Sequence, residues 1–251
     1  MHKRIIGIGW DVGGWMGKKQ GFAVCIWHWE EQKLSWPGKP IVTTLPSGHL
    51  LSPNDILRAS GCSSSLIDME DDNLSFVIAI DAPLWYPKGF INFIQGASTI
   101  KAKPESEITN PLAYRKPEQY IYRKFAKKPM SAPFDRIGNN ATVAVTHVRK
   151  WESETGFVLR PSEKAKTEKA KTGKDIIEVY PALVKAEPEY RESFTETIPK
   201  GGASPADAFD AGICALLAIK YHVGKELFGL PNLTGPEGIT EDYSEGWIYH
   251  I

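Results

Sequence analysis

Residues 74–80 read Leu-Ser-Phe-Val-Ile-Ala-Ile, so the segment is apolar apart from one serine. A short apolar run of this kind is typical of a strand buried on both faces, and such strands are usually parallel and covered by helices. The run ends at Asp81-Ala-Pro83, where the proline cannot donate a hydrogen bond to a sheet. This segment therefore predicts an α/β fold with a covered central sheet.

Further strands are predicted from β-branched and alternating apolar residues. Three of them open the chain, over residues 3–10, 21–30 and 33–44, and their short connections indicate an antiparallel meander. A late strand over residues 175–180 ends at Pro181. Helical patterns with capping and stop signals cover residues 54–59, 118–125, 140–155 and 204–223.

The composition is that of a globular protein, with 251 residues, 42% hydrophobic and 24% charged. No linker divides the chain, so we expect one domain over residues 1–251, with an irregular, proline-rich basic insertion around residues 84–135. Cys25, Cys62 and Cys214 are scattered, which argues against a disulfide framework or a thiolate zinc site. With no membrane-length apolar run and no signal-peptide pattern, we expect a cytoplasmic protein.

The charge is balanced overall, with 30 basic and 30 acidic residues, which disfavours a dedicated nucleic-acid binder. The distribution is uneven, because residues 101–150 contain eleven Lys or Arg and four Asp or Glu. A basic segment near an acidic site is compatible with nucleic acid or another phosphate-bearing partner. The alternative is a solvated insertion, since runs of charge usually lie on the surface.

Carboxylates stand where predicted strands end and where the last long helix begins. Asp11 and Asp81 follow strands, Glu178 lies in the late strand, and Asp207 and Asp210 share one face of the helix. Sites in open α/β sheets form outside the carboxyl ends of the strands. Carboxylates gathered there repel one another and need a cation, and an all-oxygen ligand set points to Mg²⁺ or Mn²⁺.

Most of these positions also have a structural explanation. Asp207 completes a Ser-x-x-Asp pattern and could cap its helix, whereas Asp210 lies past the capping turn. Asp81 could shape the turn before its proline. Asp11 could form a tight turn with the two glycines at 13 and 14, or those glycines could form a phosphate-binding nest. Glu178 could simply face solvent.

Five short motifs occur in a fixed order: Ile-Gly-Ile-Gly-Trp-Asp11-Val-Gly-Gly-Trp15, Ile-Ala-Ile-Asp81-Ala-Pro-Leu84, Glu178-Val-Tyr-Pro181, Asp207-Ala-Phe-Asp210 and Glu245-Gly-Trp-Ile248. Together they resemble the domain of unknown function 429 family, whose members are described as predicted ribonuclease-H-like nucleases. The resemblance spans residues 5 to 250. The family often carries a histidine before the helical acidic pair, where this chain has Gly-Ala-Ser-Pro at 202–205.

The resemblance implies a ribonuclease-H-like fold with a five-stranded mixed sheet, three strands antiparallel and two parallel, and helices on both faces. It also implies metal ligands on the first strand, the fourth strand and the last helix. These map onto Asp11, Asp81 and the Asp207/Asp210 pair, and Glu178 is a further catalytic candidate. Arg115 and Arg136 lie in a segment that resembles the family's Arg- and Asp-rich middle.

The resulting hypothesis is a nuclease in which two divalent ions, Mg²⁺ or Mn²⁺, promote in-line cleavage of a phosphodiester. Arg115 and Arg136 would hold substrate phosphates, and Trp15 could stack on a base, although aromatic residues beside a sheet are more often core. One alternative is a non-catalytic scaffold of the same fold that binds nucleic acid. Another is an actin-like or sugar-kinase-type nucleotide-binding protein, because Asp11-Val-Gly-Gly resembles a phosphate loop. That reading lacks a second such loop and room for a duplicated fold.

Overall fold

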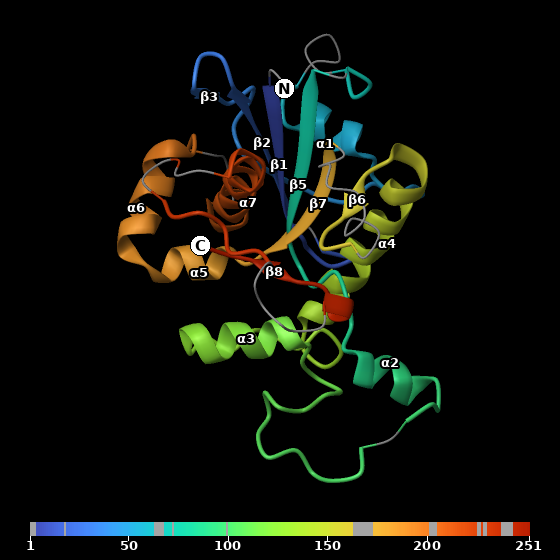
Figure 1. The fold of residues 1–251 in the computed structure, drawn as a ribbon. Coiled ribbons are helices and arrows are strands. Elements are labelled where there is room, and N and C mark those ends of the chain that lie inside the picture. Colours follow the sequence, from blue (N-terminus) through green and yellow to red (C-terminus); the bar gives the residue numbers. More distant parts are fainter. Residues whose placement is uncertain are drawn as a thin grey trace.

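Within the described residues, eight strands form one mixed sheet at the centre of the protein (Figure 1). The computed structural model describes residues 4–17, 19–62, 68–71, 73–98, 100–162, 173–200, 205–224, 227, 230–236 and 243–251. The strands follow the order β3-β2-β1-β5-β7-β6, with β4 paired to β2 and β8 paired to β7. The predicted α/β class with a mixed sheet is confirmed, whereas the predicted count of five strands is wrong.

The antiparallel half of the sheet begins with β1 (Arg4–Asp11) and β2 (Gln20–His28). The predicted third strand is split into β3 (Lys33–Ser35) and β4 (Ile41–Thr43), which both pair antiparallel with β2. Two prolines, at positions 37 and 40, lie between them and have no N–H group for the sheet ladder. This interruption accounts for one of the additional strands.

The parallel half of the sheet is built around β5 (Leu74–Asp81), which lies between β1 and β7 (Lys174–Val179). β5 is buried up to its last residue, as its apolar run predicts. The two-residue strands β6 (Val158–Leu159) and β8 (Ile248–Tyr249) both pair parallel with β7. Segments of two residues cannot display an alternating pattern, so the sequence did not predict them as strands.

Helices cover both faces of the sheet, as expected. One core layer includes residues of α1 (Pro53–Ala59) and α4 (Ile137–Thr155). The opposite layer is dominated by α7 (Pro205–Val223), with contributions from α5 (Pro181–Ala186) and α6 (Pro188–Thr197), which lie beside α7 in Figure 1. Although α7 is long and buried, no described helix is both long and apolar enough to cross a membrane.

The irregular segment 84–135 contains α2 (Lys88–Ile94) and α3 (Lys116–Phe125), joined by turns and loops. In Figure 1 both helices lie beyond the end of the sheet at which β5 finishes. Glu245, in the 3-10 helix η2 (Tyr243–Glu245), accepts hydrogen bonds from the first backbone N–H group of each helix, at 2.6 and 2.9 Å. One carboxylate therefore ties both helices to the end of the chain.

α3, α4, α1 and α7 agree with predicted helices within a few residues, whereas α2, α5 and α6 were not predicted. α2 has no buried residue, so it carries no apolar stripe that faces the core. α5 and α6 each begin at a proline, a residue favoured in the first helical turn. The predicted cap at Ser204 and the segment that replaces the family histidine lie outside the described residues, apart from Pro205.

Candidate active site

α7 lies against β1 and β2 so closely that glycine is required beneath it. A side chain at Gly9 in β1 would overlap the carbonyl oxygen of Ala211, and one at Gly21 in β2 would overlap that of Asp207. The absence of a Cβ atom lets the helix backbone rest directly on the strands. This contact brings the start of α7 to the end of β1, and thereby places Asp207 and Asp210 beside Asp11.

Asp11 and Asp81 end β1 and β5, and they are direct partners in the parallel ladder. Neighbouring strands are about 4.8 Å apart, so the two half-buried carboxyl groups leave the sheet side by side. Burial, followed by the charges of Asp81, Asp210 and Asp207, raises the pKa of Asp11 to about 8. Burial and the charge of Asp210 raise the pKa of Asp81 to about 7. Asp11 and Asp81 therefore lie side by side, near enough to Asp210 for its charge to act on both.

Lys185 of α5 supplies a positive charge to this cluster. Its ammonium group donates a hydrogen bond of 2.6 Å to Oδ2 of Asp210. The Oδ1 atom of the same carboxylate is buried and has no hydrogen-bond partner among the described residues. Burial raises the pKa of Asp210 and Lys185 lowers it. Lys185 also lowers the pKa of Asp11 and Asp81. One lysine therefore compensates part of the charge of three carboxylates.

Asp207 lies at the edge of the cluster. Its carboxylate is 3.8 Å from the ammonium group of Lys19, whose side chain is largely exposed. Asp207 contributes to the raised pKa of Asp11 and of Asp210. Its position in the first turn of α7 is compatible both with an outer place in the carboxylate cluster and with capping of the helix.

Glu178 lies beside the cluster but is engaged in a different interaction. The Arg115 guanidinium donates to both of its carboxylate oxygens, at 2.9 and 2.6 Å, and the backbone N–H of Leu84 donates to one of them at 2.9 Å. Arg115 also pairs with Glu118 and is fully buried. Arg115 thus joins α3 to β7, and its buried position offers no access to a substrate phosphate. We therefore leave Arg115 and Glu178 out of the catalytic set.

Arg136 and Trp15 lie at the surface. Arg136 is exposed at the start of α4, where a phosphate could reach it. The Trp15 indole N–H donates to the Thr142 hydroxyl on α4 at 2.9 Å, and its ring is 6.0 Å from that of His147. Trp15 therefore packs along α4 with 38% of its surface exposed, which leaves its role in base stacking a prediction.

The glycine loop after Asp11 is shaped from within the protein. The backbone N–H of Gly13 donates to the side-chain oxygen of buried Gln20 at 3.0 Å, and the N–H of Gly17 donates to the carbonyl of Gly14 at 2.9 Å. Asn140 of α4 donates to the carbonyl of Val12 at 2.5 Å. Because two of the loop's N–H groups already have partners, it is a poor phosphate cradle.

Carboxylate oxygens are suitable ligands for a hard divalent cation such as Mg²⁺. The positions of these carboxylates meet the requirements of such a site only in part. No group of three or more Asp, Glu, His or Cys side chains in the described part of the chain is placed to hold a metal ion. Mg²⁺, however, commonly uses only one or two carboxylates and completes its shell with water and substrate phosphates. Adjacent Asp11 and Asp81 meet that requirement, whereas one carboxylate oxygen of Asp210 is bonded to Lys185.

Comparison with known proteins identifies no relative. No family model matches the chain, and neither the curated proteins nor the solved structures contain a match to it. The assignment of a function therefore depends on the site itself.

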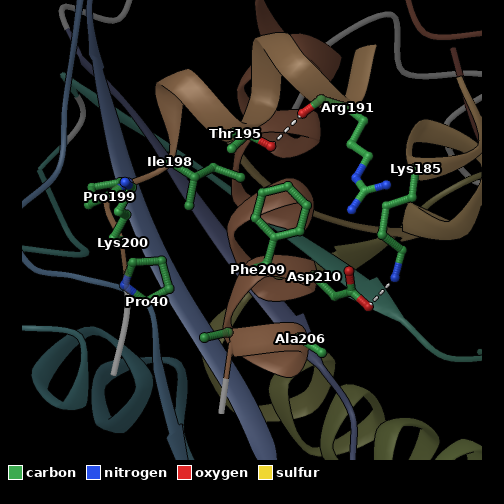
Figure 2. Close-up of a pocket in the computed structure, with 11 residues that line it drawn as sticks. Pro40, Lys185, Arg191, Thr195, Ile198, Pro199, Lys200, Ala206, Phe209 and Asp210 are labelled. Atoms are coloured by element: carbon green, nitrogen blue, oxygen red, sulfur yellow. Dashed lines mark hydrogen bonds and ion pairs between the residues drawn. The ribbon is translucent and has the colours of Figure 1, made fainter. Parts of the chain in front are cut away.

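Sequence reasoning missed Lys185 and the cavity next to it. A cavity of about 770 Å³ lies between α6, α7 and Pro40, and both Asp210 and Lys185 line it (Figure 2). Lys185 follows the Glu-Val-Tyr-Pro motif by four residues, in the last turn of the short helix α5, which was not predicted. The proline at the start of α5 was the available signal, since a proline that ends a strand can also begin a helix.

Proposed function

We propose that this protein is a divalent-metal-dependent phosphodiester hydrolase of the nuclease type, built on a ribonuclease-H-like fold. The observation that carries the proposal is the register of Asp11 and Asp81, which are adjacent at the ends of parallel strands and are both repelled by the charge of Asp210. The pKa values of about 8 for Asp11 and about 7 for Asp81 mean that burial and neighbouring charges disfavour the ionised carboxylates. A bound cation would stabilise these ionised forms. Such perturbed groups are common at functional sites.

In this proposal Asp11 and Asp81 hold the metal, Mg²⁺ or Mn²⁺, and Asp210 becomes a further ligand when Lys185 releases it. The metal would lower the pKa of a bound water and stabilise charge on the phosphate oxygens. Asp207 acts as an outer carboxylate that restrains Lys19. Exposed Arg136 is the remaining candidate for contact with a distant phosphate of a longer nucleic acid.

The proposed fold agrees with the arrangement of the central strands. An antiparallel β1–β2 pair leads into parallel β1, β5 and β7, with acidic residues at the ends of β1 and β5 and on α7. The extra short strands lie at the margins of this arrangement. This order supports the resemblance to the predicted ribonuclease-H-like family.

The alternative of a non-catalytic scaffold has one observation in its favour, which is the Lys185–Asp210 bond. A lysine that neutralises an acidic cluster can replace a metal rather than await one. The actin-like alternative is disfavoured, because the backbone N–H of Gly13, which a phosphate would need, already donates to Gln20. Mn²⁺ binding separates the first alternative from the enzyme.

The test is cleavage of labelled single-stranded, duplex and branched DNA and RNA in the presence of Mg²⁺ or Mn²⁺. We expect cleavage by the natural protein, loss of at least about a hundredfold in Asp11→Asn and Asp81→Asn, and no loss in the exposed control Asp68→Asn. Calorimetric titration with Mn²⁺ should show binding that both site variants weaken. Failure to cleave any substrate, together with no Mn²⁺ binding at millimolar concentration, would reject the proposal in favour of a scaffold.

A further inference from the structure

The cavity beside the carboxylate cluster has the size of a small-molecule site. Its volume of about 770 Å³ falls within the range of roughly 300–1,000 Å³ that is usual for ligand pockets. Asp210 belongs to its lining and also contributes to the raised pKa of Asp11 and Asp81. A ligand in this cavity would therefore lie directly next to the proposed reaction centre.

The polar part of the lining favours an anion. Lys185, Arg191 and Lys200 contribute three positive charges, whereas Asp210 contributes one negative charge and is already paired with Lys185. Within the described residues, no ion pair or side-chain hydrogen bond occupies Arg191 or Lys200. An arginine presents a planar set of donors that matches a phosphate group. Figure 2 places Arg191 beside Lys185 and Asp210, and Lys200 on the opposite side of the cavity, so Arg191 is the group that can bind a phosphate next to the carboxylate cluster.

The remaining part of the lining is apolar and contains a flat ring. Figure 2 shows the Phe209 side chain projecting between Ile198 on one side and the Arg191, Lys185 and Asp210 side chains on the other. Pro40 and Pro199 complete the apolar side of the cavity. Aromatic rings stack on the faces of bases without regard to base sequence. This wall suits a planar ring rather than a second charged group.

A neighbouring hollow limits the length of the ligand. It shares Lys185 and Arg191 with the cavity but is also lined by Glu192 and Glu196 of α6. A long polyanion that extended past Arg191 would meet these two carboxylates. The lining at Arg191 therefore favours one phosphate and disfavours a track of several.

We propose that this cavity binds a single nucleoside monophosphate unit, with its base against Phe209 and its phosphate on Arg191, beside Lys185 and Asp210 (Figure 2). The inference rests on the proposed function and names its substrate class: a free nucleotide ester or the terminal nucleotide of a strand, held so that the adjoining ester bond lies at Asp210. The interior of a duplex does not fit, because its bases are paired and stacked.

The binding experiment uses calorimetry with adenosine 5′-monophosphate in EDTA, so that metal plays no part. We expect the affinity to fall about tenfold in Arg191→Ala and in Phe209→Leu, which keeps an apolar side chain but removes the ring. The matched controls are Arg58→Ala on α1, which packs against the opposite face of the sheet, and Phe93→Leu on α2, where the side chain is exposed. Neither control should change the affinity.

Ribose 5-phosphate and adenosine should each bind at least about tenfold more weakly than the complete nucleotide, because each lacks one half of the recognised group. An oligonucleotide with one unpaired terminal nucleotide, compared with free adenosine 5′-monophosphate, distinguishes the two sources of the ligand. Absence of binding at millimolar nucleotide, or equal affinity in the natural protein and both pocket variants, would overturn the inference.

The cleavage assay keeps this inference separate from the proposed function. Cleavage with Mn²⁺ by a protein that does not bind the nucleotide would reject the cavity's role and leave the hydrolase intact. Nucleotide binding that depends on Arg191 and Phe209, without cleavage of any substrate, would support the cavity and reject the hydrolase.

Discussion

The ammonium group of Lys185 lies 2.6 Å from Oδ2 of Asp210, and this bond joins α5 to α7 at the edge of the carboxylate cluster. The two side chains are 35% and 15% exposed, so solvent screens the ion pair only in part. We expect Lys185→Met to lower the free energy of unfolding by about 1 kcal/mol and to raise the pKa of Asp11 and Asp81 further. Urea unfolding and NMR titration of the carboxyl carbons measure the two effects.

The matched control is Lys128→Met. Lys128 is 2.7 Å from Glu107, but both side chains are well exposed, so its loss should leave the stability essentially unchanged. Equal effects of the two substitutions would show that the Lys185–Asp210 bond has no special role in the cluster.

The stability of the protein should depend on pH through Asp11. Its pKa is raised from 3.8 to about 8, chiefly by burial, so above pH 4 the folded state binds more protons than the unfolded chain. The contribution to stability is complete below the unfolded pKa and is lost as pH rises toward 8. Asp11→Asn, which is neutral throughout, should therefore be more stable than the natural protein at about pH 8 and similar to it near pH 4.

Urea denaturation at a series of pH values tests this prediction, with Asp68→Asn as an exposed control that should follow the natural curve. Because Asp11 and Asp81 interact, the fall should extend over several pH units instead of following a single titration. Parallel curves for the natural protein and Asp11→Asn would contradict it.

Arg115 should be important for folding and not for contact with substrate. Its replacement by Met would leave Glu118 and Glu178 buried with a charge that nothing compensates, and we expect a loss of about 3–5 kcal/mol of stability. Arg136→Met removes an exposed arginine from the same stretch of sequence and should change stability by less than about 0.5 kcal/mol. Thermal unfolding compares the two, and a stable Arg115→Met protein with weakened nucleic-acid binding would restore the phosphate-binding role.

Gly9 should tolerate no side chain. The methyl group of Gly9→Ala would meet the carbonyl oxygen of Ala211, so α7 would have to move away from β1 and carry Asp210 with it. We expect a stability loss of about 1–3 kcal/mol or more, together with loss of the proposed cleavage. Gly48→Ala is the comparison: its positive φ costs about 1 kcal/mol but nothing lies near, so cleavage should be retained. Full activity in Gly9→Ala would contradict the close packing of α7.

The sequence predicted the long strands of the sheet well and missed its shortest ones. The apolar run of β5 and the alternating residues of β2 are local patterns, and both strands lie where those patterns place them. β6 and β8 are two residues long and exist because β7 offers them an edge to pair with. No pattern within two residues can report a partner that is distant in the chain.

The candidate site likewise has features that the sequence predicted and features that depend on distant parts of the chain. The sequence by itself determined that Asp11 and Asp81 end their strands. Only the tertiary structure decided which charges pair. Arg115 lies 63 residues from Glu178, and Lys185 lies 25 residues from Asp210. Strand ends follow from local backbone preferences, whereas the partner of a charge depends on which side chains share a buried volume once the helices have packed.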